Sequence, residues 1–73
     1  MEAYKERFIE EYKQLKTRLN KLDAIIDGYD NGTLNFTPTC DIDLLREQSF
    51  YMKGYLKILE RRSRVERIIL PEV

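Results

Sequence analysis

The fold is decided by residues 44–65, which read LLREQSFYMKGYLKILERRSRV. Apolar residues recur here in two neighbouring rows with seven-residue spacing: Leu45, Met52 and Leu59 in one, and Leu44, Tyr51, Ile58 and Val65 in the other. The strip between the rows holds Gln48, Tyr55, Arg62 and Ile69. A seven-residue repeat is typical of a coiled-coil helix. Two rows make an apolar face wider than one neighbouring helix can cover.

This helix is expected to span about 41–69. A polar side chain near its start, Thr37 or one of residues 39–41, supplies the N-cap. Pro71 prevents extension at the other end, because a helix rarely continues into a proline.

A first helix is expected over about 2–28, where neither glycine nor proline interrupts the chain before Gly28. Its apolar row has spacings of three and four residues and consists of Tyr4, Phe8, Tyr12, Leu15, Leu19, Leu22 and Ile26. Such spacing places all of them on one helical face. Gly28 suits a left-handed C-cap.

The segment at about 29–40 is expected to be a loop, because Asn31-Gly32 and Pro38 are turn signals. Leu34 and Phe36 are expected to tuck under it. A loop joining neighbouring helices makes them antiparallel. That arrangement brings glutamates of the first helix near arginines of the second: Glu2, Glu6, Glu10 and Glu11 against Arg61, Arg62, Arg64 and Arg67.

The predicted fold is therefore all-α, a single domain over residues 1–73 that forms an antiparallel two-helix hairpin resembling a coiled coil. A chain of 73 residues has a marginal core and usually needs disulfides, a metal or association. One cysteine and no histidine exclude an internal disulfide and the usual zinc sets. We therefore expect a homo-oligomer, with an interface formed by Leu44, Tyr51, Ile58, Val65, Tyr12 and Phe8.

The overall charge gives no strong signal for nucleic acid, because 13 basic residues balance 13 acidic ones. The sequence lacks an apolar run of about 18 residues that could span a membrane. Its N-terminus does not read as a signal peptide. A cytoplasmic protein is the resulting expectation.

Catalysis is not expected, because the commonest general base, histidine, is missing. Cys40 could be a reactive thiol or a small packing residue. Asp41, Asp43 and Glu47 could hold a cation, but carboxylates in a first helical turn are also favoured by the helix dipole. We favour the second interpretation and expect no metal and no cofactor.

The clearest charge asymmetry is the arginine cluster of residues 61–64. Arginine binds phosphate in a bidentate manner, and tyrosine rings can stack on a nucleobase. The candidate ligand-binding residues are Arg61, Arg62, Arg64, Tyr51, Tyr55 and Gln48. The alternative is that these arginines only pair with the glutamates of the first helix.

The sequence also resembles a family of small phage proteins. The resemblance rests on YKERFIEEY at residues 4–12, on Leu15 and residues 19–22, and on LLREQ at 44–48 with Met52, Tyr55, Ile58, Leu59 and Arg62. That family consists of uncharacterised helical-hairpin proteins first noted in crAss-like phages. The resemblance implies a phage accessory protein that acts on the host.

Three functions remain open at this point. The first is a homo-oligomeric sponge that sequesters a small phosphate-bearing, nucleotide-type immune signal of the host. The second is an inhibitor or adaptor that lays the apolar face of its second helix on a host protein. The third is a structural coiled-coil accessory.

Overall fold

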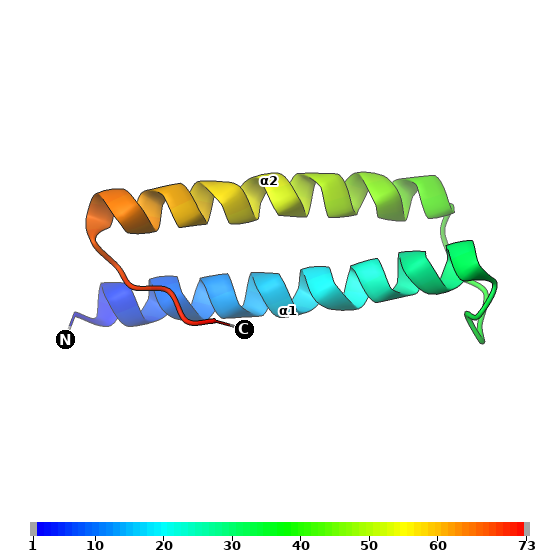
Figure 1. Ribbon diagram of the computed structural model, residues 1–73, viewed down its shortest axis with the longest axis horizontal. Helices are drawn as coiled ribbons and strands as arrows, with labels where there is room; N and C mark the ends of the chain where they lie inside the picture. The colour runs from blue at the N-terminus through cyan, green and yellow to red at the C-terminus, as the bar shows by residue number, and fades with distance from the viewer. Residues whose placement is uncertain (1, 73) are drawn as a thin grey trace.

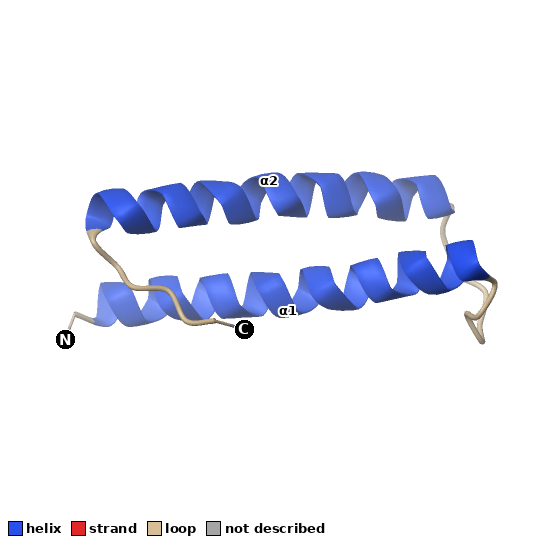
Figure 2. Ribbon diagram, in the orientation of Figure 1, coloured by secondary structure: helices blue, strands red, loops and turns tan. Residues whose placement is uncertain are grey.

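The computed structural model describes residues 2–72 and contains two helices, α1 (Ala3–Asn31) and α2 (Ile42–Glu66). They lie side by side, run in opposite directions and are joined by a loop at one end (Figures 1 and 2). The described chain measures 45 × 18 × 18 Å. The predicted all-α hairpin is confirmed.

The core lies between one face of each helix. On α1 the buried side chains are Phe8, Tyr12, Leu15, Leu19, Leu22 and Ile26. On α2 the covered face, here called the inner seam, has alternating spacings of three and four: Ile42, Leu45, Ser49, Met52, Leu56, Leu59, Ser63 and Glu66. Leu59, at 1% exposed, is the most buried side chain. The apolar row of Leu45, Met52 and Leu59 is thus the row that packs on α1.

Two serines interrupt this seam, and each has a hydrogen-bond partner. The Ser49 hydroxyl donates to Asp23 Oδ1 at 2.6 Å, and the Ser63 hydroxyl donates to the carbonyl of Glu60 at 2.6 Å. Both serines are buried, at 4% and 5% exposed. A buried hydroxyl without a partner would destabilise the fold, so these bonds make serine acceptable in the core.

The first helix continues beyond its predicted end. Gly32, not Gly28, is the left-handed C-cap, with φ 71°. Gly28 stays helical because Leu34 folds back over it, with Leu34 Cδ1 3.4 Å from the place that a Cβ would take. Leu34 is half-buried, as expected for a residue under the loop, whereas Phe36 is 53% exposed and does not tuck in.

The second helix starts as predicted and ends early. Asp41 is its N-cap and accepts a hydrogen bond from the Asp43 amide at 3.0 Å. The helix ends at Glu66 instead of about residue 69, because Arg67 adopts a left-handed conformation with φ 57°. This turn sends Ile68 into the core, where it is 7% exposed beside Phe8 and Leu59. The tail then runs back along α1 (Figure 1).

The interhelical ion pairs lie at the loop end of the hairpin. Arg46 donates to both carboxylate oxygens of Asp30, at 3.0 Å for the Nη1 to Oδ2 bond, and Lys53 Nζ lies 3.7 Å from Asp23 Oδ2. Within residues 2–72 no ion pair joins the glutamates of α1 to the arginines of α2, so that part of the prediction is wrong. Tyr4 occupies the place where such a pair was expected, as described below.

Candidate functional site

A second apolar row of α2 lies to one side of the face that packs on α1. This outer seam consists of Leu44, Gln48, Tyr51, Tyr55, Ile58, Arg62 and Val65, with alternating spacings of four and three. Its apolar members are strongly exposed, from 45% at Tyr55 to 82% at Val65. At 3.5 residues per turn the outer seam lies roughly 100° around the helix from the inner seam. The chain therefore covers one seam and leaves the other uncovered.

Phe8 and Tyr12 do not belong to this exposed surface. They are 3% and 4% exposed within the single chain, because α2 and Ile68 already cover them. Both residues were predicted to lie in the subunit interface, and this placement is wrong because they belong to the core of the single chain. The four α2 residues of that prediction, in contrast, are all exposed: Leu44, Tyr51, Ile58 and Val65.

Arg62 is held at the edge of the outer seam by three neighbours. Its Nε donates to Glu66 Oε2 at 3.0 Å, and its Nη2 donates to the Tyr4 hydroxyl at 2.7 Å. The guanidinium also lies over the Phe8 ring, 4.9 Å from the centroid. The Tyr4 hydroxyl donates in turn to Glu66. A guanidinium fixed in this way needs less ordering when it binds an anion, which favours binding.

Tyr4, Arg62 and Glu66, here called the triad, shift one another's pKa values. The Tyr4 hydroxyl and then the Arg62 guanidinium lower the pKa of Glu66 below its ordinary value of 4.5 by bonding to the ionised carboxylate. The bond to Glu66 raises the pKa of Tyr4 above 10.0, and Glu66 raises the pKa of Arg62. Glu66 and Arg62 are therefore charged throughout the neutral range, and the Tyr4 hydroxyl stays neutral.

We expect acid to weaken the hairpin through this triad. A carboxylate whose folded pKa is lowered contributes stability above its unfolded pKa, and the contribution is lost as pH falls through the folded value. Melting temperature should therefore fall as the pH drops below 4.5, the ordinary pKa of the Glu66 carboxyl. Tyr4→Phe removes the largest cause of the Glu66 shift and should reduce this slope. An unchanged pH profile in Tyr4→Phe would contradict the assignment.

A shallow groove lies beside Arg62 on the outer seam. Its volume is about 290 Å³, and it is lined by Ile58, Arg61, Arg62, Val65 and Glu66. Arg61 makes no side-chain hydrogen bond or ion pair within the described residues. The groove thus joins an apolar floor to two arginines, one fixed by its neighbours and one free to contact an anion.

The six candidate ligand-binding residues do not converge in one chain. Tyr55 is two turns before Arg62, about 10 Å along the helix, whereas Tyr51 is about 16 Å and Gln48 about 21 Å away at 1.5 Å per residue. Arg64 lies about 200° around the helix from Arg62 and does not line the groove. Within one chain, Arg61 and Arg62 therefore lie together, and Tyr55 is close enough to contact a nucleotide bound to them. Tyr51, Gln48 and Arg64 lie too far from this arginine pair or on another side of the helix.

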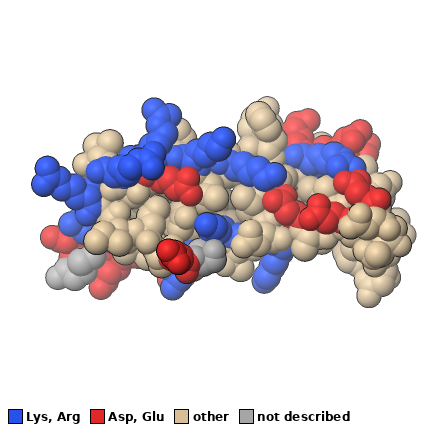
Figure 3. Space-filling model, viewed as in Figure 1, with Lys and Arg blue, Asp and Glu red and all other residues tan. Residues whose placement is uncertain are grey.

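Basic side chains also gather along α2 outside the groove (Figure 3). They include Lys53, Lys57 and Arg64, all exposed. Lys53 pairs with Asp23. Lys57, one turn before Arg61, extends the positive field next to the groove, which favours an anionic ligand over a cationic one.

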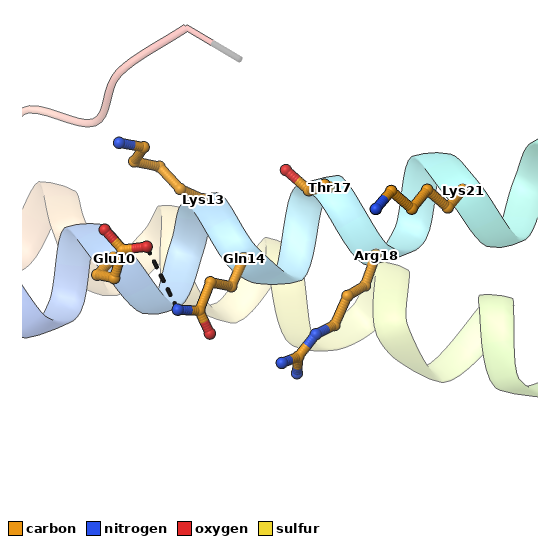
Figure 4. Close-up of a pocket in the computed structure, with 6 residues that line it drawn as sticks. All are labelled: Glu10, Lys13, Gln14, Thr17, Arg18 and Lys21. Atoms are coloured by element: carbon orange, nitrogen blue, oxygen red, sulfur yellow. Dashed lines mark hydrogen bonds between the residues drawn. The ribbon is translucent and has the colours of Figure 1, made fainter.

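Two other hollows are less suited to a ligand. One, of about 280 Å³, is formed by six α1 side chains that project from a single helix, with Gln14 bonded to Glu10 at 3.3 Å (Figure 4). The other, of about 370 Å³, lies between the helices near the loop. Its carboxylates Asp23 and Asp30 already pair with Lys53 and Arg46.

The acidic start of α2 offers no cation site in the described chain. Asp41 is used as the N-cap, and residues 2–72 contain no group of three or more potential metal ligands. Cys40 is exposed and forms no disulfide.

Sequence reasoning missed two partners of Arg62, namely Glu66 and Tyr4, whereas Gly54 was predicted from the sequence to allow another backbone to approach. Glu66 could have been found as the residue four after Arg62, but Tyr4 comes from the other helix and carries no local signal. Apart from its chain neighbours and the nearby helix backbone, nothing lies within 4 Å of the place that a Cβ at Gly54, in the middle of α2, would take. Nothing inside the hairpin therefore accounts for this glycine.

The fold and site define a small helical hairpin with an uncovered, arginine-edged apolar face. Neither helix of the described chain has a stretch long and apolar enough to cross a membrane. A family model described as Sequestin matches residues 2–64, and the chain belongs to the Sequestin family. The comparisons with curated proteins and with solved structures found no match.

Proposed function

We propose that this protein is a non-enzymatic, homo-oligomeric sponge that sequesters a small phosphate-bearing, nucleotide-type signal. It would be a phage accessory protein that acts in the host cytoplasm against an immune signal. The family name Sequestin supports sequestration as the mode of action. The resemblance to small hairpin proteins of crAss-like phages supports the phage origin.

The observation that carries the proposal is the arginine groove on the outer seam. Arg62 is oriented by Glu66, Tyr4 and Phe8, and Arg61 beside it has no partner in the described chain. Ile58 and Val65 supply an apolar floor. Phosphate is recognised by guanidinium groups, while a base needs an apolar or aromatic surface, and the groove offers both.

The rival function is an inhibitor or adaptor that docks the outer seam on a host protein. The exposure of Leu44, Tyr51, Ile58 and Val65 favours it equally. It does not require an oriented arginine, and it does not require the purified chain to associate with itself. A chain that stays monomeric and does not respond to nucleotides would favour this function.

Melting temperature measured with a panel of nucleotides tests the sponge. Cyclic AMP, cyclic di-AMP and ADP serve as probes, with inorganic phosphate as a control for charge alone. A ligand that binds only the folded state at about 100 times its dissociation constant adds about 2.7 kcal/mol, which raises the melting temperature of a chain of this size by about 10–20 °C. If no nucleotide raises the melting temperature, the sponge proposal fails for this class of ligand.

Arg61→Ala should then weaken nucleotide binding about ten- to a hundredfold, because a charge-assisted bond to phosphate contributes about 1.5–3 kcal/mol. The fold should be unaffected, because Arg61 has no intramolecular partner in the described chain. Titration calorimetry measures the change, with Lys57→Ala as the matched control outside the groove. Equal losses in both variants would indicate a diffuse charge effect instead of a site.

A further inference from the structure

The uncovered outer seam is large enough to form an interface. Six apolar side chains on or next to it are 45–90% exposed: Leu44, Tyr51, Tyr55, Ile58, Val65 and Ile69. Large side chains present roughly 150–250 Å² each when free, so together they offer on the order of 800 Å². That is about the area that each partner contributes to a standard stable interface. It exceeds the largest apolar patch of a typical monomer, roughly 300–600 Å².

The order of residues along the outer seam is complementary to itself when reversed. If a second α2 runs antiparallel, Tyr55 meets Ile58 of the second copy, Tyr51 meets Arg62, and Gln48 meets Val65. Each polar member then faces an aromatic or aliphatic side chain. Leu44 lies just past the last turn of the other α2, beside the tail that carries the 90% exposed Ile69. Such self-complementarity is what a two-fold interface requires.

Other arrangements of two copies are less favourable. A parallel pair would place Arg62 against Arg62 of the second copy, and two desolvated like charges repel. An antiparallel pair shifted by seven residues would oppose Arg62 to Leu44 and leave Val65, which is 82% exposed, uncovered. The unshifted antiparallel pair avoids both problems.

The exposed face of Arg62 can accept a side chain of the second copy. One face of its guanidinium lies on Phe8, and the side chain remains 44% exposed. The ring of Tyr51 from a second copy can stack against the open face, because a planar guanidinium packs well on aromatic rings. This contact would bring Tyr51 to the arginine pair, from which it is about 16 Å away along its own helix.

The antiparallel pair also explains why residue 54 is a glycine. In the unshifted antiparallel pair it lies within two residues, about 3 Å, of the position opposite Arg61 of the second copy. Its missing side chain leaves room beside that guanidinium, since apart from its chain neighbours and the nearby helix backbone nothing in its own chain comes within 4 Å of the Cβ position. An anion held by Arg61 can therefore approach the backbone of the second copy's α2.

We propose that two copies pack antiparallel through the outer seam and that each phosphate site is composite, with Arg61 and Arg62 from one copy and Tyr51 and Gly54 from the other. The composite site rests on the proposed nucleotide binding, whereas the dimer does not. In this dimer Ile58 and Val65 lie against Tyr55 and Gln48 of the second copy, so the base would contact Tyr51 and not the apolar floor of the groove. Each dimer holds two identical sites related by the two-fold axis.

Disulfide cross-linking tests the dimer without any ligand. In a Cys40→Ser background, the double variant Tyr51→Cys/Arg62→Cys should form a covalent dimer under mild oxidation. The single variant Tyr51→Cys should not, because its two thiols would be about 16 Å apart along the axis. Efficient cross-linking of the single variant would show a parallel pair, and no cross-linking of the double variant would show that this seam is not the interface. Either result overturns the proposal.

Mixing two binding-deficient variants tests whether the site is shared. Tyr51→Ala and Arg61→Ala should each lose at least tenfold in affinity for the best-binding nucleotide of cyclic AMP, cyclic di-AMP and ADP. After equimolar mixing and subunit exchange, half of the dimers are mixed, and each regains one of its two sites. High-affinity binding should therefore return to about one quarter of the wild-type capacity. No recovery, with exchange verified by native mass spectrometry, would place the site within one chain.

Gly54→Ala separates binding from folding. Alanine favours the helix over glycine, so the melting temperature of the free protein should rise. The added methyl group takes up the room beside Arg61 of the second copy, so nucleotide affinity should fall at least fivefold. Unchanged affinity in this variant would remove Gly54 from the site.

A wild-type protein that binds none of the three nucleotides would refute the proposed function and the composite site together, while cross-linking would still report on the dimer.

Discussion

Leu59→Ala is expected to unfold the hairpin or bring it close to unfolding at room temperature. Leu59 is 1% exposed and belongs to the cluster formed by Phe8, Tyr12, Leu15 and Ile68. Replacing a buried leucine by alanine costs about 2–5 kcal/mol. A chain of this length has a total stability of roughly 4–11 kcal/mol. Denaturant unfolding followed by circular dichroism, at fixed protein concentration, measures the loss.

Phe50→Ala is the matched control for this substitution. It removes a larger side chain from the same helix, but Phe50 is 69% exposed and its one aromatic neighbour is Tyr51. Its cost should stay below about 1 kcal/mol, as for most surface changes. Similar effects of the two substitutions would mean that Leu59 is not at the centre of the core.

The architecture could be predicted because the apolar spacing of both helices is strong. The two apolar rows that begin at Leu45 and Leu44 are both visible in the sequence. Two rows on one helix already indicated more apolar surface than α1 alone could cover. The full inner seam was harder to find. Ser49 and Ser63 occupy two of its positions, and a search for apolar residues passes over them because their acceptability depends on Asp23 and on a backbone carbonyl.

The end of α2 could not be predicted from local pattern. Nothing before Pro71 opposes a helix to about residue 69, and arginine is an unfavourable residue at positive φ. The structure nevertheless places Arg67 there, because the turn lets Ile68 and Leu70 cover the open end of the core. Tertiary burial outweighed helical preference, and this competition is invisible without the positions of Phe8 and Leu59.

The candidate site was predicted in part. Arg62 stood out as a charge on an apolar face, and that interpretation led to the groove with Arg61. Its partners did not stand out, because Tyr4 lies 58 residues away in the sequence. Tyr51 and Gln48 were grouped with Arg62 from their shared helical face alone. Helical rise separates them in one chain, and only a second copy would reunite Tyr51 with the arginines.

The two seams of α2 have different roles: the inner seam stabilises the fold, and the outer seam is proposed to mediate association. The inner seam holds the hairpin together with α1 and the tail, and the outer seam adds little to the stability of a single chain because its side chains remain exposed. Substitutions on the outer seam should therefore abolish association while leaving the helices intact.

Ile58→Glu is the sharpest test of that division. In the proposed dimer Ile58 lies next to the two-fold axis and faces Tyr55. The substitution therefore buries two carboxylates close to each other, and the nearest guanidinium, Arg62, is already paired with Glu66. Burying a charge without a partner costs several kcal/mol, and about 4 kcal/mol in total weakens the dimer roughly a thousandfold. Sedimentation equilibrium should find a dimer for the wild type and a monomer for Ile58→Glu at micromolar concentration, with similar helical circular dichroism. Phe50→Glu, an equally drastic change off the outer seam, should remain a dimer. A dimeric Ile58→Glu or a monomeric wild type would mean that the exposed face of α2 serves something other than self-association.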